Sequence, residues 1–357
     1  MHKRPFSFIF MSLLFLFTTS ISAMEKTFYI MRTNSASSLA ESKNLTKKLS
    51  KHKQAIDTII SQAYQVDQHG AIWGSLNLSV EKWCQHNNKK LMAMVTNQGY
   101  SAKKLHAFLA SPHKQQRAIN GLITACNHHK LYGIQIDFEH VGIEDESLFT
   151  RFYQKLSTAM HKQGFALSVA IFPATQKIQP TGYSMTLSNN WSGGYDYSAL
   201  GKASDFVTLM AYDQHVALTT PGPVAGLPWV KAIIDYAAKS IPKDKLSLGI
   251  PTYSNYWSVN KSGGNYKAIG KQISFSLANS ILEKFNTPTH WSKKQQVPYA
   301  IFSNNFLNEY LFIEDARSFE QKMQLVEKYH LRGFSVWRLG TEDPGIWGKI
   351  AAQKQAA

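Results

Sequence analysis

Short apolar runs alternate along the chain with longer stretches in which apolar residues recur every three or four positions. The first pattern is typical of buried strands and the second of amphipathic helices. The expected strands cover residues 28–32, 55–64 with 72–73 after a glycine-containing turn, 90–96, a segment ending at 139, 165–172, 206–212, 246–251 and 334–339. The expected helices cover residues 39–49, 80–87, 112–129, 145–163, 229–239, 318–329 and 344–352.

This order of elements predicts an α/β fold. Repeated strand–helix units imply a parallel sheet, and about eight of them suggest a sheet closed into a (β/α)8, or TIM, barrel. Two connections are long, at residues 174–197 and 252–317. The second is too long for a loop between a strand and a helix. We therefore expect one barrel over residues 24–357, with a small α+β lobe inserted after the seventh strand at about residues 253–317.

The first 23 residues have the pattern of a secretory signal peptide. His2, Lys3 and Arg4 form a basic start, residues 6–17 are apolar apart from serines, and mostly small or polar residues follow up to Ala23. A membrane anchor is the alternative, but the apolar run is short for a bilayer span. The pattern predicts cleavage after Ala23 and export to the periplasm or the medium, with no stable membrane span in the remaining chain.

The chain is strongly basic, with 39 Lys and Arg against 23 Asp and Glu and a formal net charge of +16. Such a surface favours anionic partners, which for an exported protein are cell-wall polymers or lipid surfaces. The basic residues are scattered, and no basic helix or RNA-type aromatic motif occurs, so nucleic acid is not an expected partner. No pattern selects an oligomeric state.

The two cysteines, Cys84 and Cys126, each stand near the end of an expected helix. Export permits a disulfide between them, and two buried free thiols are the alternative. Their spacing matches no metal site.

The strand that ends at Glu139 carries the most informative pattern in the chain. One face is apolar, and the opposite face carries Gln135, Asp137 and Glu139. Burying an amide and two carboxyls is costly unless they have a chemical role, and a solvated sheet edge is the alternative. Two acids in alternate positions of a strand lie roughly 6–7 Å apart. In a shielded site they resist ionising together, so one keeps a proton near neutral pH and can act as a general acid.

Further polar and aromatic residues follow the ends of other expected strands: Met210, Tyr212 and Asp213 at the sixth, Tyr253 at the seventh and Trp337 at the eighth. In a TIM barrel the carboxyl ends of the strands meet at one mouth, where functional groups collect. Aromatic rings stack on the apolar faces of sugar rings, and polar groups bind sugar hydroxyls and amides. The set predicts a sugar-binding mouth, and the alternative is that Tyr212 and Trp337 are ordinary barrel core.

Several of these segments resemble family-18 glycoside hydrolases. Residues 133–139 are similar to the Asp-Gly-x-Asp-x-Asp-x-Glu strand of that family, and Met-Ala-Tyr-Asp at residues 210–213 is similar to its motif on the sixth strand. Residues 221–230, 248–253 and 337–344 resemble the branch that contains bacterial spore-cortex-lytic N-acetylglucosaminidases. The resemblance covers the chain from about residue 91 to the C-terminus.

The resemblance implies a role for each matching residue. Glu139 matches the proton donor, Asp137 the acid that orients the substrate's N-acetyl group, Tyr212 the tyrosine that binds the acetamido carbonyl, and Trp337 the floor of the subsite for the reacting sugar, with Met210 and Asp213 in supporting positions. In this family the acetamido oxygen of the substrate is the nucleophile. The implied partner is therefore a GlcNAc-containing polysaccharide or oligosaccharide, from peptidoglycan, chitin or N-glycan cores, cut in endo or exo fashion, and no metal or cofactor is expected.

Two positions depart from the family pattern. Tyr132 stands in place of the first acid, a commonly structural position, and Gln135 in place of the middle acid. We expect the Gln135 amide to donate a hydrogen bond to Asp137, although it cannot relay a proton. A glycosidase is the leading hypothesis, and a catalytically impaired glycan-binding protein is the alternative. Glu139 and His140 are adjacent and point to opposite faces of a strand, which argues against a shared metal ion.

Overall fold

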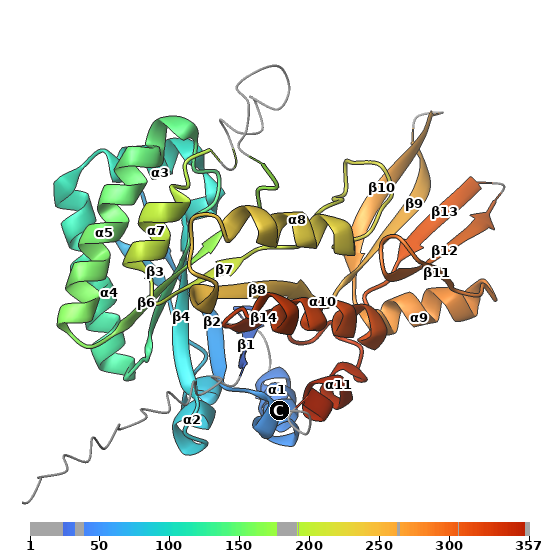
Figure 1. The fold of residues 1–357 in the computed structure, drawn as a ribbon, viewed down its shortest axis with the longest axis horizontal. Helices are drawn as coiled ribbons and strands as arrows, with labels where there is room; N and C mark the ends of the chain where they lie inside the picture. The colour runs from blue at the N-terminus through green and yellow to red at the C-terminus, as the bar shows by residue number, and fades with distance from the viewer. Residues whose placement is uncertain are drawn as a thin grey trace, which may run out of the picture.

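The computed structural model describes residues 24–32, 39–176, 191, 193–262, 265–305 and 307–353. Within these residues, eight parallel strands form a closed barrel with helices between them, which confirms the expected α/β TIM barrel (Figure 1). The barrel strands are β1 (Glu25–Ile30), β2 (Thr58–Val66), β4 (Lys90–Asn97), β5 (Gly133–Asp137), β6 (Ala166–Ile171), β7 (Phe206–Leu209), β8 (Leu246–Pro251) and β14 (Gly333–Trp337). Pairing between β1 and β2 closes the sheet, and the short strand β3 (Ile72–Gly74) pairs antiparallel with β2 as a hairpin.

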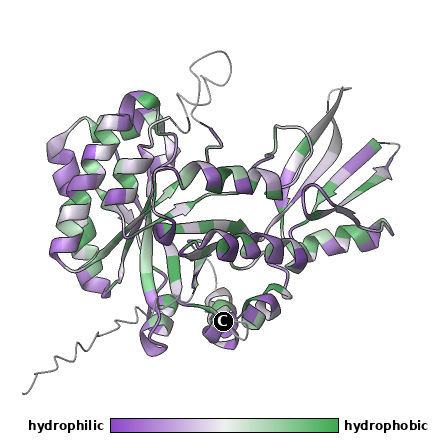
Figure 2. Ribbon diagram, viewed as in Figure 1, coloured by the Kyte–Doolittle hydropathy of each residue, from purple (hydrophilic) through white to green (hydrophobic). Residues whose placement is uncertain are grey.

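Amphipathic helices surround the barrel, with hydrophobic and hydrophilic residues interspersed along each of them (Figure 2). They are α1 (Leu39–Lys51), α2 (Leu78–His86), α3 (Ala102–Leu109), α4 (Pro112–His129), α5 (Glu146–Lys162), α7 (Tyr197–Ala203), α8 (Leu227–Ala237), α10 (Ala316–Tyr329) and α11 (Ile346–Gln353). The apolar periodicity did not predict α3, since a helix of eight residues buries only Leu105, Phe108 and Leu109. Its start is marked instead by Ser101, whose side chain accepts from the backbone N–H of Lys104.

The two faces of β5 have opposite surroundings. Its apolar face packs on the helix layer, where the ring of Phe138 lies stacked at 6.0 Å from Phe152 of α5. Gln135 and Asp137 lie on the other face and are 0% and 4% exposed. The polar face is therefore enclosed by the barrel, which rules out the solvated sheet edge.

An antiparallel lobe projects from one side of the barrel between β8 and α10 (Figure 1). It consists of β9 (Ser254–Ser262), β10 (Asn265–Ile273), β11 (His290–Ser292), β12 (Val297–Asn304), β13 (Leu307–Phe312) and α9 (Phe275–Lys284). Strands and helix share a small core of their own, which includes Ala278, Phe302 and Leu311. The α+β insertion expected after the seventh barrel strand is thus confirmed.

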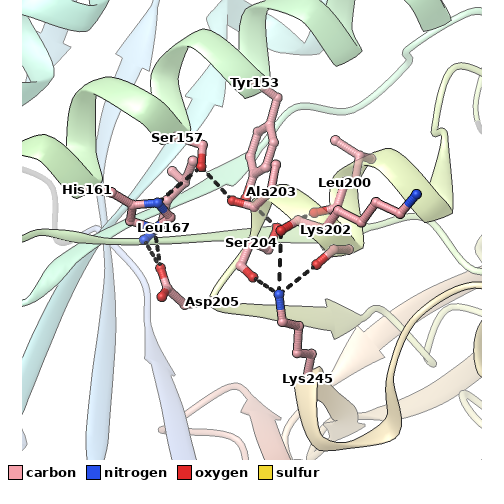
Figure 3. Close-up of polar contacts among 11 residues, drawn as sticks. Tyr153, Ser157, His161, Leu167, Leu200, Lys202, Ala203, Ser204, Asp205 and Lys245 are labelled. Atoms are coloured by element: carbon pink, nitrogen blue, oxygen red, sulfur yellow. Dashed lines mark hydrogen bonds and ion pairs between the residues drawn. The ribbon is translucent and has the colours of Figure 1, made fainter.

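A polar cluster ties α5, α7 and β7 together near the amino ends of the strands (Figure 3). Nζ of Lys245 donates to the carbonyl oxygens of Gly201 and Ser204 at 3.1 and 2.8 Å, at the C-terminal end of α7. Ser157, His161 and Asp205 form a chain that resembles a nucleophile, a base and an acid. However, Oγ of Ser157 donates to the carbonyl oxygen of Ala203 at 2.7 Å, so its proton is committed to the backbone and the cluster is structural.

The structure also bears on the two cysteines and on whether a helix could cross a membrane. Cys84 and Cys126 are both buried free thiols, so the second of the two alternatives for them holds. No helix in the described part of the chain combines the length and apolarity needed to cross a membrane. The expected signal peptide, residues 1–23, lies outside the described residues.

Gly133 at the start of β5 tests how tightly this strand is packed. A Cβ atom at this position would lie 2.0 Å from the carbonyl oxygen of Ala166 on β6. Gly133→Ala should therefore destabilise the protein by about 2–3 kcal/mol, because backbone atoms of a central strand must move apart. Urea unfolding measures the change.

Gly348→Ala in α11 is the matched control, since a Cβ there meets nothing within 4 Å. It should leave stability unchanged or raise it by about 0.5–1 kcal/mol. Equal effects of the two substitutions would contradict the packing of β5 described above.

Candidate active site

The carboxyl end of β5 forms the first wall of the site. Asp137 is the last residue of β5, and Glu139 lies just beyond the strand and is partly buried. The backbone N–H of Glu139 donates to Oδ1 of Asn97 at 2.9 Å, and Nδ2 of Asn97 donates to the carbonyl oxygen of Glu139 at 3.0 Å. Since Asn97 ends the neighbouring strand β4, this reciprocal pair holds Glu139 in place beyond the last residue of β5.

The ends of the other strands complete a pocket at the barrel mouth. It is lined by Tyr29, Met94, Asp137, Glu139, Ala170, Phe172, Pro173, Met210, Tyr212, Asp213 and Trp337. The structure thus brings together six of the eight residues singled out from the sequence. The pocket holds about 90 Å³, less than pockets that take a whole drug-sized ligand, which suits the floor of an open cleft.

Aromatic rings form one side of this pocket. The rings of Tyr212 and Trp337 are nearly parallel, with centroids 6.0 Å apart and an interplanar angle of 14°. Tyr29 of β1 meets Trp337 edge-on at 5.2 Å. Burial raises the pKa of Tyr212 well above its ordinary value, so its hydroxyl stays protonated and can donate a hydrogen bond.

Tyr253 lies behind the pocket wall and holds one of its residues. Its buried hydroxyl donates to Oδ1 of Asp213. Nε2 of Gln272, on lobe strand β10, donates to the same oxygen at 2.9 Å. Two donors from different parts of the chain thus fix Asp213 at the mouth, and direct substrate binding by Tyr253 stays a prediction.

Gln135 makes different contacts from those expected. Its Oε1 accepts from the hydroxyl of Tyr29 at 2.5 Å, and its Nε2 donates to Oγ1 of Thr208 at 3.1 Å. The expected hydrogen bond to Asp137 is absent from the described contacts, and Oδ1 of Asp137 is buried without a hydrogen-bond partner. The expectation was wrong because the longer amide side chain reaches across the barrel to β7, where a hydroxyl is available.

The carboxyls of the site are electrostatically coupled. Burial raises the pKa of Asp137 above its ordinary value, because the charged form is desolvated. Burial also raises the pKa of Glu139, and the negative charges of Asp137 and Asp213 raise it further. Near neutral pH the site therefore retains a proton, and Glu139 is equipped to donate it at the mouth.

Sequence reasoning missed several residues of the site. Asn97 is a polar residue at the end of the third barrel strand, so the rule that identified Asp137 and Trp337 applies to it equally. Tyr29 was hidden inside an apolar strand, between Phe28 and Ile30. Only the pairing of β1 with β14 brings its ring to Trp337.

His140, which follows Glu139 beyond β5, makes a hydrogen bond to the backbone. Its Nδ1 donates to the carbonyl oxygen of Tyr100 at 2.6 Å. In the described ranges no group of three or more His, Cys, Asp or Glu side chains is placed to hold a metal ion.

Comparison with known proteins identifies the class to which this barrel belongs. The model of the family described as glycosyl hydrolases family 18 matches residues 28–342. The chain belongs to this family, and the barrel fold agrees with that assignment.

Three similar proteins, all from species of Bacillus, show the extent of the match. The chain is 26% identical over 308 residues to the uncharacterized glycosylase YvbX of Bacillus subtilis (strain 168), covering 85% of this chain and 86% of the relative. It is 26% identical over 296 residues to the cortical fragment-lytic enzyme of the same organism, covering 82% of this chain and 66% of that protein, just under two thirds of its length. The crystal structure of the Bacillus cereus spore cortex-lytic enzyme SleL superposes with a TM-score of 0.81 at 22% identity, covering 92% of this chain and 73% of that chain.

Glu139→Gln tests the retained proton. Because the pKa of Glu139 is raised in the folded chain, the folded state binds more protons than the unfolded state, and stability is lost as the pH rises through the folded-state pKa. Glutamine does not ionise, so the melting temperature of the variant relative to the parent should increase between about pH 5 and pH 9. Differential scanning calorimetry across this range measures the difference.

Glu144→Gln is the control, since Glu144 is exposed on the short helical turn Ile143–Asp145 that follows β5. The substitution removes one glutamate that lines no part of the pocket, so it controls for the loss of a carboxyl elsewhere on the same turn. A pH-independent difference for Glu139→Gln would contradict the raised pKa.

Proposed function

We propose that this protein is an exported glycosidase that hydrolyses β-linked, N-acetylglucosamine-containing glycans with retention of configuration. The observation that carries the proposal is the placement of Asp137, Glu139, Tyr212 and Trp337 in one pocket at the barrel mouth. A proton donor, a second acid, a hydroxyl donor and an indole ring are the groups that substrate-assisted hydrolysis of an N-acetylated sugar requires. The proposed β-N-acetylglucosaminidase or chitinase-like activity uses no metal or cofactor.

Glu139 is the proposed general acid. With its pKa raised, it keeps a proton at a pH at which an ordinary carboxyl has lost it, and it delivers this proton to the glycosidic oxygen as the bond breaks. As that bond breaks, the acetamido oxygen of the substrate bonds to the anomeric carbon and closes a ring. The Glu139 carboxylate then takes a proton from the water that attacks this carbon and reopens the ring. Its backbone pairing with Asn97 keeps the side chain at the mouth during both steps.

Asp137 and Tyr212 are the proposed partners of the acetamido group. The buried Oδ1 of Asp137 has no hydrogen-bond partner in the described residues, so it can accept from the acetamido N–H and orient the carbonyl oxygen towards the anomeric carbon. The protonated hydroxyl of Tyr212 can donate to that carbonyl. Trp337 then supports the apolar face of the same sugar, with Met210 and Asp213 around it.

The proposed substrates are glycans of the peptidoglycan or chitin type. Relatives named for lysis of cortical fragments and of the spore cortex support the first. The basic composition suits an anionic polymer, and the signal-peptide pattern of residues 1–23 supports export to the periplasm or the medium.

Glu139→Gln should lower hydrolysis of GlcNAc oligomers by at least about 10²–10⁴-fold, because the isosteric amide cannot give up a proton. Glycan binding should persist, since shape and size are kept. Mass spectrometry of products from purified peptidoglycan and from chitin oligomers measures turnover and identifies the bond cut. Glu144→Gln serves as control and should retain parent activity, whereas undiminished turnover by Glu139→Gln would contradict the assignment.

The alternative is a glycan-binding protein with impaired catalysis. One observation favours it: Gln135 bonds to Tyr29 and Thr208, and Asp137 receives no support from it. The same product assay decides between the two, because a binding protein would retain oligomers without shortening them. Asp137, Glu139 and Tyr212 in their expected positions favour the enzyme.

A further inference from the structure

A second cavity lies at the opposite end of the barrel from the catalytic pocket. It opens where α2 and α4 end and the chain enters β4 and β5. Lys90 at this cavity is the first residue of β4, whereas Asn97, the last residue of the same strand, bonds to Glu139. The cavity holds about 270 Å³, against about 90 Å³ for the catalytic pocket. We call it the basic cavity, and its polar lining residues include Gln85, Asn88, Lys89, Lys90, His129 and Lys130.

Three lysines give the basic cavity its charge. Nζ of Lys90 lies 4.7 Å from the centroid of the exposed Tyr132 ring and 3.5 Å from Oε1 of Glu25. Arg332 binds Glu25 at 2.7 Å, so Glu25 does not cancel the charge of Lys90. The C-terminal ends of α2 and α4 each carry roughly half a negative charge, which offsets about one lysine. Within the described chain no Asp or Glu lines the cavity, so the surplus is positive.

The backbone holds the walls of the basic cavity in place. Nδ1 of His129 bonds to Oε2 of Glu81 at 2.9 Å, which joins α4 to α2 and pairs the acid nearest to that wall. The backbone N–H of Lys89 donates back to a carbonyl oxygen of α2 at 2.9 Å, and that of Lys130 donates to the last turn of α4. The two turns that carry these lysines are therefore closed onto their helices, and a ligand meets a site that is already formed.

The catalytic mouth has a different character. Its lining includes Asp137, Glu139 and Asp213, and no lysine or arginine lines it in the described ranges. The floor of the mouth thus offers no cation to an anionic group, although the whole chain has a net charge of +16. Attraction between this protein and an anionic polymer must act elsewhere on its surface. The basic cavity is a concave place where it can act.

We propose that the basic cavity binds an oxyanion, a phosphate or a carboxylate, carried by an anionic cell-wall polymer. Lysine ammonium groups form charge-assisted hydrogen bonds to both kinds of group, and the amides of Gln85 and Asn88 add neutral donors. Because the cavity and the mouth lie at opposite ends of the barrel, the bound polymer leaves the mouth open. Attachment during hydrolysis of a neutral sugar chain rests on the proposed function, whereas the oxyanion site does not.

The test compares two double variants that remove the same charge. Lys89→Gln with Lys130→Gln alters the basic cavity. Lys293→Gln with Lys294→Gln alters two exposed lobe residues that line neither cavity nor mouth. In the Glu139→Gln background, co-sedimentation with purified peptidoglycan that retains its attached polymers measures wall affinity, and calorimetry measures affinity for inorganic phosphate. We expect both affinities to fall on the order of tenfold in the cavity variant, and to stay within about twofold of the parent in the lobe variant.

Treatment of the wall before sedimentation identifies the oxyanion. Hydrofluoric acid cleaves phosphodiesters and amidation neutralises carboxyls, so the difference between the two variants should disappear after one of these treatments. A difference that survives both would overturn the proposal. Equal losses in the two double variants would assign the attraction to net charge alone and would also overturn it, as would parent-like wall binding by the cavity variant.

Hydrolysis of a soluble, uncharged GlcNAc oligomer separates this proposal from the proposed function. In the active chain both double variants should match the parent, because the oligomer needs only the mouth. A loss of oligomer hydrolysis in the cavity variant would contradict the separation of the two sites. Absence of hydrolysis by the parent would contradict the proposed function and leave the oxyanion site standing.

Discussion

Two carboxyls at the carboxyl end of β5, one buried and one partly buried, are the constraint on which the rest of the site depends. Removing a charge from water is costly, so a buried pair of acids stays in place only if at least one of them is protonated or is met by donors. Here Oδ1 of Asp137 has no donor among the described residues, and the pKa of both acids is raised. Because both pKa values are raised, the pair keeps a proton near neutral pH, at the mouth where a glycosidic oxygen can receive it.

The insertion lobe takes part in this electrostatic arrangement. Burial raises the pKa of Asp213, and the hydrogen bonds that Tyr253 after β8 and Gln272 on β10 donate to it offset part of that rise. The charge of Asp213 in turn contributes to the raised pKa of Glu139. Gln272 of the lobe therefore influences the pKa of Glu139 indirectly, through the carboxylate of Asp213.

The sequence predicted the elements and positions that follow from local patterns. Period-two alternation located β5 and put Asp137 and Glu139 on one face, and the rule that groups collect at strand ends located Tyr212 and Trp337. The partners of Gln135 could not be predicted, because Thr208 is 73 residues away in sequence and becomes a neighbour only when the barrel closes.

The central claim is that Glu139 keeps its proton to a higher pH than an ordinary glutamate. A titration of carboxyl ¹³C chemical shifts, with glutamate labelled and the Glu139 signal assigned by its absence in Glu139→Gln, measures this directly. The account predicts a midpoint well above the ordinary value of about 4.3, and a lower midpoint in Asp137→Asn, where one negative neighbour is gone. A midpoint at the ordinary value in the parent chain would contradict it.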